Sequence, residues 1–284
     1  MIYLDYSANT PVDEAVLQRF CEVERNCPGN ANSRHAAGTA AKAAIDAATQ
    51  SIARSLNVQP AEIIYTSGAS EANNFAIKSI ARLERHHGRH IISTPLEHSS
   101  VSGSLTAHKF YGLNGIGVLV KRRGLALEPL IHGGESTTIY RSGTPTVALA
   151  CSLALALDKA MTELPERVER VRSLNARLRT ELANYPKVRI NSPEAAVPQI
   201  LNLSVKDVKG TVFQRELDAH GVCVSVKSAC SSDGLPSRAV FAVSRDRRNA
   251  LSSWRISLSH RTTDEEITGF LQAFDACYRT LTQP

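Results

Sequence analysis

Residues 62–74 read EIIYTSGASEANN and contain a short strand, a tight turn and the beginning of a helix. The apolar run 63–65 predicts a buried strand, and the Ser-Gly pair that follows allows a sharp turn of the backbone. A helix is expected over about 71–86 and a second strand after it, so that 63–94 forms one strand–helix–strand unit. This order of elements is typical of an α/β protein.

The turn in this unit has the composition of an anion-binding site. Gly68, Ala69 and Ser70 precede the helix, where free backbone N–H groups and the helix dipole suit a phosphate. The Ser70 hydroxyl would add one more donor. A simpler alternative remains open, in which Ser67 or Ser70 only caps the helix.

Helical and strand patterns alternate along the rest of the chain and change in character beyond Pro186. Before this point the segments are long, and after it shorter strands and helices predict an α+β region. We therefore expect two domains, 1–160 and 161–284. The other expected elements are helices at 36–57, 146–184 (with a junction at Pro165), 212–220 and 263–281, and strands within 109–120 and at 188–191, 200–205, 222–225 and 254–258.

Composition excludes several classes of protein. With 284 residues, 43% hydrophobic and 21% charged, the chain is neither fibrous nor disordered. Its longest apolar run, 147–157, is too short for the roughly 20 residues of a membrane span, and no secretory signal is visible, so we expect a cytoplasmic protein. The net charge of +6 comes from scattered basic residues, which predicts no required nucleic-acid partner. The six cysteines include no CxxC pair, and we expect no metal site.

Two further motifs carry reactive side chains. Lys109 precedes an aromatic pair and a glycine beside an apolar strand, so we expect it to be partly desolvated. Burial lowers the pKa of an amine and suits it to Schiff-base chemistry, whereas a plain surface lysine is the alternative. Cys230 lies in the polar segment 225–237 near Lys227, where an accessible thiol could act as a nucleophile or be an incidental surface cysteine.

In their order along the chain, these motifs and several others resemble the cysteine desulfurases of the NifS/IscS type. Those proteins are fold-type I pyridoxal-phosphate (PLP) enzymes of the class V aminotransferase superfamily. The resemblance implies a three-layer α/β/α large domain, here shortened, and a small α+β C-terminal domain with the cysteine loop. The segments that carry it are Tyr3–Ala8, Gly29–Asn30, 66–74, Glu97–His98, 107–112, Arg141–Thr144, Ser228–Cys230, 254–258 and 261–266.

The resemblance also implies an activity, namely conversion of L-cysteine to L-alanine by a homodimer that passes sulfur to an acceptor of iron–sulfur or thiolation pathways. Lys109 would bind PLP as a Schiff base and move the α-proton, and Cys230 would take the sulfur as a persulfide. Arg255 would hold the substrate carboxylate, and Asn32 would contact the substrate. His98 would stack on the pyridine ring and take part in proton transfers as a catalytic residue. The phosphate contacts would come from Gly68, Ala69, Ser70, Thr106 and His108, and from Thr144, which would reach the phosphate of the neighbouring subunit.

The chain departs from the family between His98 and Thr106. Only Ser99–Leu105 joins them, where the family has several βα units. If three units of roughly 30 residues each are absent, about 90 residues are missing. That segment would carry the aspartate that keeps the PLP pyridine nitrogen protonated, and the chain has no A-D-x-A-Q motif. The alternatives are therefore an impaired or non-enzymatic family member that acts through dimerisation or interaction, and a selenocysteine lyase or another PLP enzyme of this class.

Overall fold

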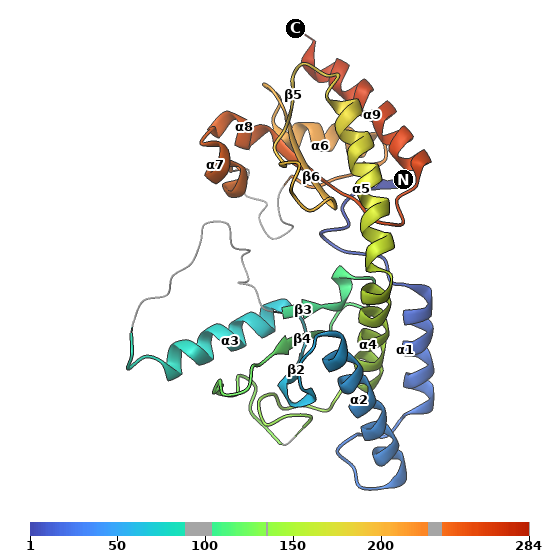
Figure 1. The fold of residues 1–284 in the computed structure, drawn as a ribbon, viewed down its shortest axis with the longest axis vertical. Coiled ribbons are helices and arrows are strands. Elements are labelled where there is room, and N and C mark those ends of the chain that lie inside the picture. Colours follow the sequence, from blue (N-terminus) through green and yellow to red (C-terminus); the bar gives the residue numbers. More distant parts are fainter. Residues whose placement is uncertain (89–103, 135, 227–234, 284) are drawn as a thin grey trace. The chain divides into compact units, whose positions relative to one another are not determined.

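The computed structural model describes residues 1–88, 104–134, 136–226 and 235–283, which fall into two compact units (Figure 1). We call the unit of residues 10–162 the lysine unit, because it contains Lys109. The arginine unit, which contains Arg255, combines residues 1–9 with the chain from Glu163 onward. The sequence prediction assigned residues 1–9 to the first domain, whereas in the structure they belong to the same unit as the C-terminal part.

The lysine unit contains a three-stranded sheet of order β2-β4-β3, in which the central strand is antiparallel to both neighbours. Gly117 at the start of the central strand lies opposite both Thr66 and Thr106. The two outer strands therefore end at the same edge of the sheet, and the turns that follow them lie side by side. The described elements are α1 (Glu14–Asn26), α2 (Ala36–Ser55), η1 (Pro60–Glu62), β2 (Ile63–Thr66), α3 (Ala69–Leu83), β3 (Ser104–Thr106), η2 (Ala107–Lys109), β4 (Gly117–Val120) and α4 (Val147–Thr162).

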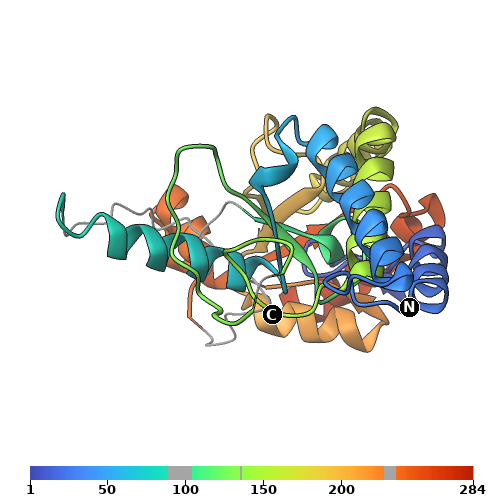
Figure 2. The same cartoon turned by 90° about the horizontal axis from the view of Figure 1, so that it is seen from below.

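Strand alternation divides the lysine unit into three layers. Ile63 and Val118 point into a cluster with helices α2 and α4, while Ile64 and Leu119 pack on the opposite face against Phe75 of α3. Helix α4 is apolar on nearly all sides because it packs against both α1 and α2 (Figures 1 and 2). The α/β class and the three-layer arrangement expected from the sequence are confirmed.

The arginine unit is built on an antiparallel sheet of order β5-β6-β8 and a short parallel pair, β1-β7. Its core centres on Trp254, which stacks on Phe213 with ring centroids 5.2 Å apart and lies beside Phe270 and Phe274. The described elements are β1 (Ile2–Tyr3), α5 (Leu164–Leu182), β5 (Val188–Ile190), β6 (Ile200–Val205), α6 (Gly210–Ala219), β7 (Val222–Cys223), α7 (Arg238–Ser244), α8 (Arg247–Ser252), β8 (Ser253–Ser257) and α9 (Asp264–Thr282).

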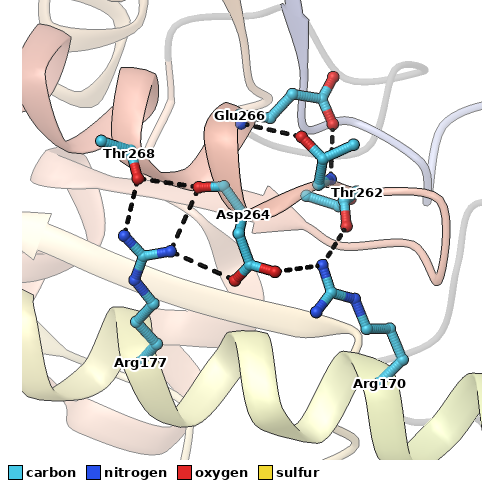
Figure 3. Close-up of polar contacts among 7 residues, drawn as sticks. Arg170, Arg177, Thr262, Asp264, Glu266 and Thr268 are labelled. Atoms are coloured by element: carbon cyan, nitrogen blue, oxygen red, sulfur yellow. Dashed lines mark hydrogen bonds and ion pairs between the residues drawn. The ribbon is translucent and has the colours of Figure 1, made fainter.

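The last helix, α9, is fixed at its N-terminus by a capping box and by two arginines of α5 (Figure 3). The Thr263 hydroxyl accepts from the Glu266 N–H at 3.1 Å, and the Glu266 carboxylate accepts from the Thr263 N–H at 2.9 Å. Arg170 and Arg177 both pair with Asp264, at 2.9 and 3.3 Å. The Arg170 hydrogen bond is the main reason why the pKa of the Asp264 carboxyl lies below its usual value.

Most of the predicted elements are confirmed to within a few residues, including the junction of two helices at Pro165, which lies in the first turn of α5. Strands β1 and β3 and helices α1, α7 and α8 are additional to those expected. The strand expected near 90–94 lies outside the described residues. Within the described ranges, every helix is too short or too polar to cross a membrane.

Candidate active site

Gly68, not a serine, is the N-cap of α3, and it makes no side-chain capping bond. The helix therefore begins at Ala69, two residues before the expected start, and the alternative that Ser67 or Ser70 caps it is wrong. The φ of Gly68 is +155°, a backbone conformation that residues with a side chain rarely adopt. The N–H groups of Ala69 and Ser70 have no acceptor among the described residues. The first turn of a helix offers such groups no acceptor within the helix itself.

Gly117 brings the backbone of the three strands together at this turn. A Cβ atom on Gly117 would lie 2.6 Å from the Leu105 carbonyl oxygen, 3.0 Å from the Gly68 Cα and 3.2 Å from the Thr66 hydroxyl. The buried Thr106 side chain also approaches Gly68, since its methyl group lies 3.7 Å from where a Cβ would sit there. The structure thus places Gly68 and Thr106 together, as predicted. Sequence reasoning missed Gly117, although the G-x-G spacing at 115–117 was a possible signal.

Lys109 lies at the end of η2, the single turn that follows β3. Its side chain is exposed, so the expected desolvation is wrong. The turn directs Ala107 and Tyr111 into the core and leaves Lys109 outside. His108, in the same turn, is half-buried, and this burial, together with the charge of Lys109, lowers the pKa of its imidazole.

Thr10, which precedes helix α1, forms hydrogen bonds to the turn that contains Lys109. Its hydroxyl donates to the His108 carbonyl oxygen at 2.8 Å and accepts from the Tyr111 N–H at 2.7 Å. Its own N–H donates to the same His108 oxygen at 2.9 Å. Thr10 is only 5% exposed, and the resemblance to desulfurases gave it no role.

Glu71 and Arg141 form an ion pair beside the first turn of α3. The Arg141 Nε donates to Glu71 at 3.0 Å, and the Ser67 N–H donates to the same carboxylate at 2.7 Å. Burial opposes ionisation of Glu71, but these hydrogen bonds outweigh it, and the pKa of the carboxyl lies below its usual value. A hollow beside the pair is lined by Ser67, Arg141 and Thr144, so the exposed Thr144 faces the same space as the turn before α3.

Arg255 lies on β8 of the arginine unit, and its side chain is 17% exposed. Its Nη2 pairs with the Asp5 carboxylate at 2.9 Å, and the other oxygen of Asp5 accepts from the Ser225 hydroxyl at 2.7 Å. Among the residues that the structure describes, none forms a hydrogen bond with the buried Nε of Arg255. Asp5 belongs to the segment that carried the family resemblance, but it was not predicted to hold the arginine.

Of the three remaining predicted site residues, the structure describes only Asn32. Asn32 is exposed in the loop between α1 and α2, where its N–H donates to the Asn30 side-chain oxygen at 2.9 Å, and it belongs to the lysine unit rather than to the unit of Arg255. His98 and Cys230 lie outside the described residues, and their roles stay predictions.

The profile of the class V aminotransferase family matches residues 2–105 and 103–270. The chain belongs to this family. Among its relatives, the cysteine desulfurase IscS of Clostridium botulinum strain Hall is 26% identical over 367 aligned positions, covering 95% of this chain and 92% of that protein. The IscS of Azotobacter vinelandii is 29% identical over 364 positions, covering 94% and 90%. A solved NifS-like protein superposes with a TM-score of 0.91 at 25% identity, over 99% of this chain and 100% of that one.

Membership in the class V aminotransferase family, with desulfurases of the NifS/IscS type among the relatives, confirms the predicted resemblance and the fold-type I fold. The 367 positions aligned with the Clostridium protein exceed the 284 residues of this chain by 83, so the alignment contains long gaps in this chain. The two matched pieces of the family profile meet at residues 103–105, where the internal deletion was expected. The shortened chain is therefore confirmed.

Proposed function

We propose that this family member is a PLP-dependent cysteine desulfurase, which converts L-cysteine to L-alanine and leaves the sulfur on Cys230. One observation carries the proposal: the turn before α3 and the turn of Lys109 lie together at one edge of the sheet, around Gly117. The proposed anion site and the lysine therefore lie in one small region of a single unit. PLP requires this combination, because its phosphate must be held while its aldehyde meets an amine.

The described residues fit the phosphate end of PLP. Ala69 and Ser70 offer backbone N–H groups at a helix N-terminus, and Gly68 leaves the approach free of a side chain. Thr106 and His108 lie on the other outer strand, β3, and on the turn after it, as the family resemblance requires. Thr144 lines the hollow beside this turn within the same chain. Its contact with the phosphate of the neighbouring subunit remains part of the proposal, on the family resemblance alone.

When bound, PLP would supply an electron sink for the substrate's α-carbon. The chain's own contributions are binding, orientation and proton movement. The exposed Lys109 amine would attach the cofactor and carry the α-proton, and His98 would stack on the ring. Arg255, oriented by Asp5, would bind the substrate carboxylate through its guanidinium, and Asn32 would contact the substrate.

The sulfur transfer balances without an external oxidant or reductant. The Cys230 thiol forms a bond to the substrate sulfur as the carbon–sulfur bond of L-cysteine breaks, and protons return to carbon. The products are L-alanine and a persulfide on Cys230, from which an acceptor of an iron–sulfur or thiolation pathway would take the sulfur. We expect a cytoplasmic homodimer.

The internal deletion favours a second candidate, a family member that acts through dimerisation or protein interaction without turnover. The alignment leaves gaps of at least 83 positions in this chain. By the family resemblance, the segment that would pair with the PLP pyridine nitrogen belongs to the missing part. Without that partner, a buried pyridinium tends to lose its proton and PLP becomes a weaker electron sink.

One experiment separates the two candidates. The full chain is purified with PLP, the visible absorbance of the bound cofactor is recorded, and alanine and sulfide are measured after addition of L-cysteine. The desulfurase proposal predicts a visible band and alanine in the wild type, loss of both in Lys109→Ala, and loss of alanine alone in Cys230→Ala. Lys78→Ala and Cys21→Ala, which change other residues of the same types, should behave like the wild type.

A band that persists in Lys109→Ala would contradict the role of that lysine. Alanine formation unchanged in Cys230→Ala would contradict the persulfide. A band with no alanine from the wild type would favour the second candidate.

A further inference from the structure

The turn that carries Lys109 is closed on itself. The Ala107 carbonyl oxygen accepts from the N–H of Phe110 at 3.1 Å and of Gly112 at 2.8 Å. A Cβ atom on Gly112 would lie only 2.6 Å from the Ala107 Cβ, so the chain returns tightly on itself. Lys109 therefore lies in a compact loop whose two ends are linked by backbone hydrogen bonds.

This loop contains a conformation that needs external support. Tyr111 has a φ of +68°, in the left-handed region that non-glycine residues adopt only at an energetic penalty. The Tyr111 N–H donates to the Thr10 hydroxyl, and its carbonyl oxygen accepts from the Asp13 N–H at 2.9 Å. The residues around Thr10 thus supply hydrogen bonds that offset the unfavourable backbone.

We propose that Thr10 is the positioning residue of Lys109. Its hydroxyl bridges the His108 carbonyl oxygen and the Tyr111 N–H, which lie on either side of the lysine. Because both neighbours are fixed by one buried side chain, the direction in which Lys109 leaves the backbone is fixed before any ligand arrives. The inference rests on the proposed function for the identity of the ligand that Lys109 meets, but not for the geometry of the turn.

The test compares Thr10→Val, which keeps the shape but removes the hydroxyl, with Thr10→Ser, which keeps the hydroxyl. Thr49→Val is the matched control, because the Thr49 hydroxyl also makes two hydrogen bonds, to the Ile45 carbonyl oxygen and the Tyr65 hydroxyl, in helix α2 of the same unit. Circular dichroism and thermal unfolding of all variants report whether they are folded.

The first readout is hydrogen exchange of the Tyr111 amide in a chain isotope-labelled at its seven tyrosines. Loss of the hydroxyl should speed exchange of this amide about tenfold in Thr10→Val and leave it near the wild-type rate in Thr10→Ser and Thr49→Val. The second readout is the rate at which PLP, fixed by borohydride, labels Lys109 relative to the other lysines. Labelling of Lys109 should fall about tenfold in Thr10→Val only.

Tyr111 exchange in Thr10→Val at the wild-type rate would overturn the proposal. So would faster exchange with unchanged labelling of Lys109, because the bridge would then be structural without positioning the lysine. A wild-type chain that takes no label at Lys109 would contradict the proposed function, and the exchange rates would then decide on their own whether Thr10 fixes the turn.

Discussion

Gly117→Ala is the substitution that most sharply tests how the fold builds the site. The added methyl group would enter a space where the Leu105 carbonyl oxygen is 2.6 Å and the Gly68 Cα 3.0 Å away. Both neighbours are backbone atoms, so relief requires the β3–β4 pair or the turn before α3 to shift. Forced overpacking of this kind lowers the free energy of unfolding by about 1–3 kcal/mol. For a unit of this size that corresponds to a fall in melting temperature of about 2–12 °C.

The assay is urea denaturation followed by circular dichroism, together with titration of the PLP band. Gly117→Ala should lower the urea midpoint with an unchanged slope and weaken PLP binding, because the displaced turn is the one proposed to hold the phosphate. Gly88→Ala is the control, since nothing lies within 4 Å of its missing Cβ, and it should be neutral or slightly stabilising. A Gly117→Ala chain as stable as the wild type, with the same affinity for PLP, would refute the reasoning.

Three further changes test other contacts. Glu71→Gln breaks the ion pair with Arg141 and should lower the free energy of unfolding by about 1–3 kcal/mol in urea. The pKa of the Glu71 carboxyl is lower in the folded chain than in the unfolded chain. The ionised carboxylate therefore stabilises the fold above the pKa of the unfolded carboxyl, and this contribution is lost as the pH falls through the folded pKa. The variant should accordingly lose less stability in acid than the wild type, and parallel pH profiles would contradict this. Asp5→Ala leaves the Arg255 charge unpaired and should lower the free energy of unfolding by about 3 kcal/mol. Much of this loss should be recovered when Arg255→Met is added. Purely additive losses in the double variant would contradict an energetic coupling between Asp5 and Arg255. Thr263→Ala removes the cap of α9 and should lower stability by about 1 kcal/mol in thermal unfolding, and an unchanged transition would count against the capping box.

The elements that could be predicted from the sequence are those fixed by their own residues. The alanine-rich periodicity of 36–57 predicts α2, and the Thr263–Glu266 pair predicts the start of α9. Strand β1 is different, because only two residues pair with β7 more than two hundred positions away. No local pattern specifies such a partner.

Within the site, the turn before α3 could be predicted because its signals are adjacent in the sequence, while its binding of a phosphate stays a proposal. The contacts of Thr10 and Asp5 join residues about 100 and 250 positions apart, and their energetic roles exist only after folding. The wrong expectation for Lys109 has a similar origin: its aromatic neighbours indicate an apolar environment, but only the fold shows that Tyr111, not the lysine, turns inward.

Mass spectrometry of the full chain after incubation with PLP and L-cysteine tests the central claim most directly. The proposed desulfurase predicts a product one sulfur atom heavier, with the added sulfur mapped to Cys230, in the wild type but not in Lys109→Ala. A wild-type chain that binds PLP yet gains no sulfur, or gains it equally without Lys109, would contradict the account.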